Sequence, residues 1–255
     1  MNALIEVCTG NLEDALKAGE TGAGRIELAQ ALEVGGVTPS YALIRRVTEK
    51  LSIPVHVLIR PRTGDFVYSP AEISIMAEDI EFCREAGAAG VVFGVLTPDG
   101  GIDETACRFL ISKAAGLSCT FHRAWDLVAR PDEWLEKMID MGFDRILTSG
   151  GEPHALTGAR NIRRWRKAVS NRIGIMPGSG ITPANIADLY RITRSLEYHM
   201  SASNAAGFGL STAGNENLLR QFGGYRFDAR TLKRTIENLQ KALATYGQAN
   251  RENEA

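Results

Sequence analysis

Short runs of alternating apolar and polar residues recur along the chain, and longer segments that could each form one helix separate them. Alternation with a period of two is typical of β-strands that have one buried face. Segments that begin with glycine, at 22–28, 87–93 and 142–148, each join the end of a predicted helix to the next predicted strand. Glycine can end a helix because it readily adopts the left-handed conformation. The predicted strands are 3–8, 25–29, 54–60, 90–94, 117–122, 144–148, 172–176 and 196–200.

Eight strands that alternate with helices in a chain of 255 residues predict an α/β fold, a single-domain TIM (β/α)8 barrel over residues 1–246. A doubly wound sheet is the rival, but neither GxGxxG nor GxxxxGK[ST] follows the first strand. Hydroxyl residues before proline predict helix starts at Thr38, Ser69 and Thr182. Ser69 also has the spacing of a capping box.

Two segments depart from this alternation of strands and helices. Residues 201–228 are rich in glycine, serine and asparagine, and they form a longer loop than most after the eighth strand. We expect a lid or a short accessory helix there. Residues 247–255 are polar and predict a frayed tail.

Parity along the strands sorts side chains onto two faces. The helices outside a barrel need the apolar face, so the polar face must point inward. Ionised groups in such an interior cost several kcal/mol each unless they are paired. We therefore expect a layer of ion pairs toward the N-terminal ends of the strands, formed by Arg25, His56, Arg145 and Glu197.

Composition narrows the choice of partners and compartment. The net charge of −1 gives no general attraction for nucleic acid or for an anionic membrane, so neither is expected as a partner. No apolar run approaches the ~20 residues of a membrane span, and the N-terminus lacks the pattern of a signal peptide. A cytoplasmic location is expected. The four cysteines form no CxxC motif and are expected to be reduced thiols.

Polar residues cluster where the strands end in sequence, and barrel enzymes carry their active sites at that rim. Cationic side chains that converge there would repel one another without an anion. Glycine-rich or hydroxyl-bearing turns after strands six, seven and eight add donors that commonly hold phosphate in barrels. The candidate anion-binding residues are Arg60, Arg62, Arg123, Ser149, Gly178, Ser179, Gly180 and Ser201.

Proton-transfer candidates share this rim. Glu6 or Glu27 together with His122 could handle protons on a small anionic, phosphorylated or carboxylated, substrate, as in an isomerase, aldolase or lyase. The same two glutamates could instead be metal ligands or the ion-pair partners of the arginines. Asp65 and Asp126 are further carboxylates that could pair with those arginines.

Eight short motifs follow one another from the first predicted strand to the eighth. They are IEVC at 5–8, RIEL at 25–28, GGVTPS at 35–40, IRPRTGDF at 59–66, FGVL at 93–96, TFHRAWD at 120–126, RILTSG at 145–150, and Glu197-x-His199-x-Ser201. These motifs, in this order, resemble the copper homeostasis protein CutC family. The resemblance implies a TIM barrel, a cytoplasmic location, a homodimer or higher homo-oligomer, and copper handling. It brings no agreed reaction.

Copper is the cofactor or cargo that this resemblance implies, with Cys8 assisted by His122 or His199. Relatives often have cysteine where this chain has Ala29, so Cys8 is the one cysteine that parity places inside the rim. Copper(I) usually takes more than one thiolate or thioether, which weakens a copper site within one barrel but leaves open a site shared between subunits. A divalent ion such as zinc or manganese, held by Glu6, Glu27, His122 and His199, is the alternative. The residues leave open whether the chain is an enzyme or a metal-binding protein.

Overall fold

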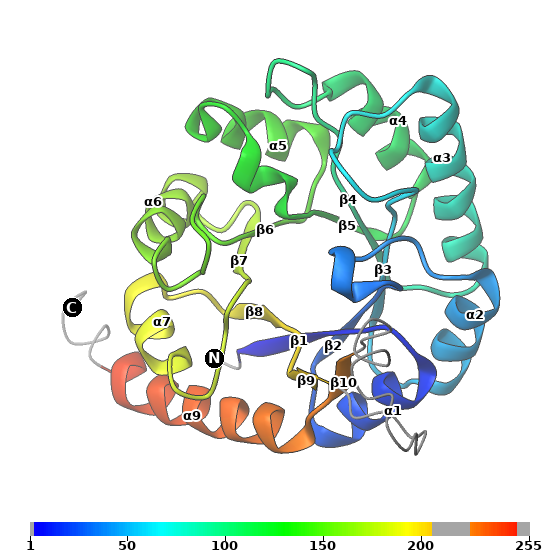
Figure 1. The fold of residues 1–255 in the computed structure, drawn as a ribbon. Helices are drawn as coiled ribbons and strands as arrows, with labels where there is room; N and C mark the ends of the chain where they lie inside the picture. The colour runs from blue at the N-terminus through cyan, green and yellow to red at the C-terminus, as the bar shows by residue number, and fades with distance from the viewer. Residues whose placement is uncertain (1–2, 206–224, 249–255) are drawn as a thin grey trace, which may run out of the picture.

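The computed structural model describes residues 3–205 and 225–248, and it confirms the TIM barrel (Figure 1). All strand pairs in the large sheet are parallel, in the order β7-β6-β5-β4-β3-β2-β1-β8, and a bridge between Gly178 and His199 joins its two edge strands. The strands are β1 (Leu4–Thr9), β2 (Arg25–Leu28), β3 (Val55–Leu58), β4 (Gly90–Phe93), β5 (Ser118–Phe121), β6 (Arg145–Thr148), β7 (Gly174–Pro177) and β8 (Glu197–Met200).

The α-helices form a ring around these strands (Figure 1). None of the described helices is both long and apolar enough to cross a membrane. The short 3-10 helices are η1 (Leu32–Val34), η2 (Arg123–Leu127) and η3 (Pro131–Trp134). The α-helices are α1 (Leu12–Thr21), α2 (Tyr41–Lys50), α3 (Pro70–Glu85), α4 (Glu104–Lys113), α5 (Leu135–Met141), α6 (Ala159–Val169), α7 (Ile186–Thr193) and α9 (Ala229–Gln248).

One of the three predicted helix starts is confirmed. Ser69 caps α3 in a complete capping box with Glu72. The other two predictions were wrong, because α2 starts after Ser40 and α7 starts after Asn185. The hydroxyl of Thr38 instead accepts the backbone N–H of Arg60 at 2.9 Å, which ties the segment before α2 to the end of β3.

The predicted loop at 201–228 contains a small antiparallel pair, β9 (Ser203–Ala205) with β10 (Tyr225–Phe227). Residues 206–224 of the predicted lid lie outside the described residues. The predicted tail at 247–255 begins inside α9, which extends to Gln248, and its residues 249–255 also lie outside them.

The main apolar core lies between the strands and the helices, as parity predicts. Val7, Ile26, Val57 and Phe121 point outward from their strands and are fully buried in this layer. Cys83, Cys107 and Cys119 belong to the same layer, and burial raises the pKa of each thiol to about 12. These three cysteines are therefore core thiols.

The barrel interior holds the predicted ion pairs. Arg25 forms a short ion pair with Glu6 and reaches Glu197 at 3.3 Å, and Arg145 binds Glu197 at 2.6 Å. The Nδ1 atom of His56 lies 4.0 Å from Glu6. Burial and the charge of Arg25 lower the pKa of His56 to about 4, against the opposing effect of Glu6. The ring is therefore neutral at pH 7. The prediction of ion pairs is therefore confirmed for Arg25, Arg145 and Glu197, which Glu6 joins, and was wrong for His56, whose neutral ring forms no ion pair at pH 7.

Replacing Arg25 with methionine tests this layer. Arg25→Met should destabilise the fold by about 3–5 kcal/mol, because it leaves the fully buried Glu6 without its cation. The free energy of unfolding in urea measures the change. Arg46→Met is the control, since its pair with Glu49 on α2 is exposed and should contribute less than about 1 kcal/mol. Equal losses in the two variants would contradict a structural role for the interior pairs.

Candidate functional site

A pocket of about 540 Å³ lies at the C-terminal ends of the strands. Its wall combines residues predicted from sequence with apolar residues of the loops that follow β2 and β3. Seven of the predicted site residues line it: Cys8, Glu27, Arg60, His122, Arg123, His199 and Ser201. The others that line it are Leu32, Val34, Gly35, Leu58, Phe66, Leu147 and Ser203.

Arg60 is a buried cation on this wall, with 6% of its surface exposed. Its Nη1 donates to the carbonyls of Val34 at 3.2 Å and Gly36 at 2.8 Å, and its Nη2 donates to the carbonyl of Gly64 at 2.9 Å. Its guanidinium also stacks 5.0 Å from the ring centre of Phe66. Within residues 3–205 and 225–248 it forms no ion pair with a carboxylate. Arg60 thus holds two loops through neutral carbonyls and keeps its charge uncompensated.

Arg62, two residues further on, is placed differently. Its guanidinium binds Glu72 at 2.6 Å and Asp65 at 3.1 Å and stacks on Tyr68. It does not line the pocket. The structure therefore forms the Arg62–Asp65 pair that the sequence suggested as an alternative to anion binding.

His122 lies beside Arg60 on the same wall. Its Nδ1 accepts the backbone N–H of Ala124 at 3.3 Å, and its ring packs 4.7 Å from Phe66. Burial, and then the charge of Arg60, lower the pKa of His122 to about 3. The ring is therefore neutral at pH 7, and because Nδ1 accepts a hydrogen bond, the proton belongs on Nε2, which has no partner in the described structure. A side chain at Gly94 would place a Cβ atom 2.8 Å from this ring, so the position needs glycine.

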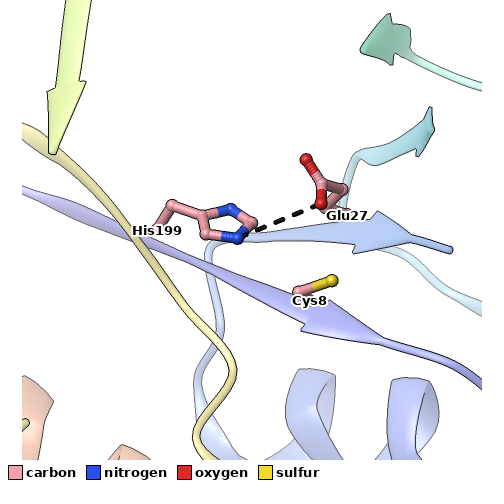
Figure 2. Close-up of side chains that lie close together, drawn as sticks. All are labelled: Cys8, Glu27 and His199. Atoms are coloured by element: carbon pink, nitrogen blue, oxygen red, sulfur yellow. Dashed lines mark ion pairs between the residues drawn. The ribbon is translucent and has the colours of Figure 1, made fainter. Parts of the chain in front are cut away.

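Three potential ligands converge on the opposite wall, from three neighbouring strands (Figure 2). One donor atom each of Cys8, Glu27 and His199 lies within 4.8 Å of the other two. His199 Nε2 lies 3.9 Å from Glu27, and its Nδ1 lies 2.7 Å from Glu6. Glu6 is therefore beneath the pocket and not on its wall. Its bond to Nδ1 turns Nε2 of His199 toward Glu27 and Cys8.

Burial and charge shift every pKa in this cluster. Burial raises the pKa of Glu27, and one of its oxygens has no hydrogen-bond partner. Burial and the neighbouring Glu27 raise the pKa of the Cys8 thiol well above its usual value. Burial alone would lower the pKa of His199, but the carboxylates of Glu27 and Glu6 raise it above its usual value. Burial alone would raise the pKa of Glu6, but His199 and Arg25 lower it below its usual value. The cluster can therefore hold a proton or a cation.

The loop after β6 is satisfied internally. Asp126 pairs with Arg123 at 2.9 Å and accepts the backbone N–H groups of Ser149 at 3.0 Å and Gly151 at 3.1 Å. It also accepts the hydroxyls of Thr148 and Ser149. Ser149 does not line the pocket. A carboxylate of the chain itself thus occupies donors that the sequence suggested for a bound anion.

The loop after β7 is engaged in a similar way. Gly178 donates its N–H to the carbonyl of Thr148 at 2.9 Å, and Ser179 donates its hydroxyl to the carbonyl of Pro153 at 2.8 Å. A Cβ atom at Gly180 would meet the ring of His154. None of the three loop residues lines the pocket, so their anion-binding role stays a prediction without a contact there.

Sequence reasoning missed the apolar part of the wall. Leu32 and Val34 lie on η1, which follows β2 within the ring of helices (Figure 1). Phe66 packs against both Arg60 and His122. The available signal was Phe66 at the end of the IRPRTGDF motif and the apolar residues just before Gly35.

Comparisons with known proteins agree with this fold. A protein of Histophilus somni named "family protein CutC" is 43% identical over 217 residues, which cover 83% of this chain and 89% of that protein. The mouse "Copper homeostasis protein cutC homolog" is 42% identical over 207 residues, which cover 81% of this chain and 76% of that protein. The crystal structure of the putative copper homeostasis protein CutC from Streptococcus agalactiae matches with a TM-score of 0.74 and 33% identity, and the match covers 78% of this chain and 98% of that one.

More distant structures share the barrel alone. N-(5'-phosphoribosyl)anthranilate isomerase from Pyrococcus furiosus matches with a TM-score of 0.56 and 14% identity, and the match covers 94% of this chain and 100% of that one. The class of protein is thus a TIM barrel whose pocket at the C-terminal rim is lined by both ionisable and apolar residues. The CutC family model matches residues 3–204, and the chain belongs to the CutC family.

The neutral state of His122 predicts a pH dependence of stability. Its pKa is about 3 in the folded protein and near 6.5 in the unfolded chain, so the unfolded chain binds more protons between these values. The stability that it contributes is complete above about pH 6.5 and is lost as the pH falls. His122→Asn keeps an acceptor for the N–H of Ala124 and should reduce the slope of unfolding free energy against pH by up to about 1.4 kcal/mol per pH unit. Urea unfolding from about pH 7.5 to about pH 4.5 measures it; an unchanged slope would show that His122 does not titrate as proposed.

Proposed function

We propose that this protein binds a small anionic molecule in the rim pocket and moves protons on it, as an isomerase, aldolase or lyase. The observation that carries the proposal is Arg60, a buried guanidinium that lines the pocket without a carboxylate partner among the described residues. A buried charge of this kind costs several kcal/mol unless an opposite charge neutralises it. An anionic ligand would supply that charge.

Proton transfer would involve groups on both walls. His122 can donate a hydrogen bond from Nε2 to an oxygen of the ligand, since this atom has no other partner in the described structure. Glu27 lines the pocket on the other side and has an oxygen without a hydrogen-bond partner. A carboxylate that accepts a proton from a carbon next to a carbonyl, and an N–H that stabilises the resulting oxyanion, form a common pair in such reactions.

Two arginines of one motif allow a direct test of the anion site. Arg60→Met should weaken the binding of small anions about 10-fold to 100-fold, because a hydrogen bond to a charged group contributes about 1.5–3 kcal/mol. Arg62→Met should bind like the native protein, since Arg62 is held by Glu72 and Asp65 outside the pocket. Thermal-shift titration with inorganic phosphate, sugar phosphates and small carboxylates measures binding to the folded state.

The opposite result would remove the proposal. If anions stabilise Arg60→Met as much as the native protein, the pocket does not use this guanidinium. If Arg62→Met alone loses binding, the site lies on the outer side of the β3 loop. The unfolding midpoint without ligand shows whether each variant is folded.

Binding of a metal ion is a second candidate function, which the Cys8, Glu27 and His199 cluster favours. Copper is one candidate metal, because the names of two relatives refer to copper homeostasis. Sulfur, nitrogen and carboxylate oxygen are all ligands that zinc accepts, and Glu6 would hold the histidine in the orientation that metal sites usually show. Copper(I) fits this set less well, because the set offers a single thiolate and copper(I) usually takes more than one sulfur ligand. Manganese also fits less well, because it prefers oxygen ligands.

Substitution of Cys8 distinguishes the metals. Cys8→Ser should weaken zinc binding at least about tenfold, because the thiolate is the strongest ligand of the set. Cys119→Ala is the control, since this thiol faces the helices and lies in the apolar core. Equilibrium dialysis of the reduced protein with zinc, manganese and copper(I) measures retention. Copper(I) retention that needs Cys8 would favour copper as the cargo, and metal retention that is equal in both variants would contradict a site at this cluster.

We also propose a cytoplasmic homo-oligomer, a homodimer or larger. The family resemblance implies both, and the four cysteines, all free in the structure, agree with a reducing compartment. Light scattering of the purified protein tests the assembly.

A further inference from the structure

The arginines that point into the barrel have carboxylate partners, except at one place. Arg25 pairs with Glu6, and Arg145 pairs with Glu197. At the rim, Arg123 pairs with Asp126 at 2.9 Å. Among the described residues, the arginine of the pocket wall that forms no such pair is Arg60. Its guanidinium therefore lacks a negative counter-charge.

The surroundings of Arg60 suit one charge and not two. Val34 and Phe66 are among the apolar residues beside it, and His122 is a neutral donor. Nη1 and Nη2 are already bonded to carbonyl oxygens of the β2 and β3 loops, whose partial negative charge adds to that of any ligand. A second negative charge on the ligand would be buried there without a counter-charge, which costs several kcal/mol.

Several backbone donors in the loops after β6 and β7 are already used. Asp126 takes the N–H groups of Ser149 and Gly151, and the N–H of Gly178 donates to Thr148. The N–H of Thr182, before α7, donates to Asn185. In the described part of the loops after β6 and β7, these donors are not free to hold the oxygens of a phosphate group.

We propose that the ligand of the rim pocket is a small monocarboxylate, such as a hydroxy acid or a sugar acid, whose carboxylate lies against Arg60. This inference rests on the proposed function and specifies its substrate class. One carboxylate neutralises one guanidinium, and its planar shape matches the planar guanidinium. The remainder of the ligand extends toward Cys8, Glu27 and His199 on the other wall.

Matched pairs of ligands test the choice between carboxylate and phosphate. The pairs are gluconate with glucose 6-phosphate, glycerate with glycerol 3-phosphate, and benzoate with phenyl phosphate. Isothermal titration at about pH 7.5 with the native protein compares the two members of each pair, since a phosphate monoester carries close to two charges there. The carboxylate of at least one pair should bind at least tenfold more tightly than its phosphate partner.

Two variants assign the result to the pocket. Arg60→Met should remove the binding of that carboxylate, and Arg60→Lys, which keeps the charge, should retain part of it. The comparison within a pair uses the native protein alone, so it remains decisive if Arg60→Met does not fold. Arg46→Met on α2 is the control for a general effect of charge.

The outcomes separate this inference from the proposed function. Tighter binding of a phosphate ester that is lost in Arg60→Met would overturn the carboxylate and leave the anion site in place. Absence of binding by every member of the panel would overturn both. Carboxylate binding that persists unchanged in a folded Arg60→Met would also overturn the inference, because the carboxylate would then lie elsewhere.

Discussion

The ion pair between Arg25 and Glu6 at the centre of the barrel is the interaction on which the pocket depends. Glu6 is fully buried, and it can stay ionised there because Arg25 and His199 both bind it. Its second oxygen then fixes Nδ1 of His199, so Nε2 faces Glu27 and Cys8 (Figure 2). The floor of the barrel thereby sets the geometry of one wall of the site, and the same pair prevents a buried carboxylate from destabilising the interior.

The fold and the inward face of each strand could be predicted from sequence, because both follow from the alternation of apolar and polar residues along the strands. Apolar Val7 and Ile26 must face the helices, so Glu6 and Arg25 must face inward, and the ion pairs follow from the cost of burying charge. The predicted pairing of Arg25, Arg145 and Glu197 is confirmed for that reason. The same reasoning placed Cys8, Glu27 and His199 inside the rim.

The rest of the site depends on loops, where side chains do not alternate between two faces in a regular pattern. Arg60 and Arg62 share one motif and one parity, yet carbonyls hold the first beside the pocket and carboxylates hold the second outside it. The sequence could suggest Asp126 as a partner for an arginine, but not that it would also take the backbone donors of the β6 loop. Helix caps at Thr38 and Thr182 failed similarly, because the first binds Arg60 and the second binds Asn185.

His199 belongs to β8, the last strand of the barrel, and is also part of the bridge to Gly178 that joins β8 to β7. Its partners Glu6 and Cys8 are on β1, which pairs directly with β8. Two ends of a long stretch of chain must therefore meet before the cluster exists. A chain still emerging from the ribosome cannot assemble this wall until its eighth strand has been synthesised and has paired with β1. Formation of the cluster is therefore a direct report of ring closure.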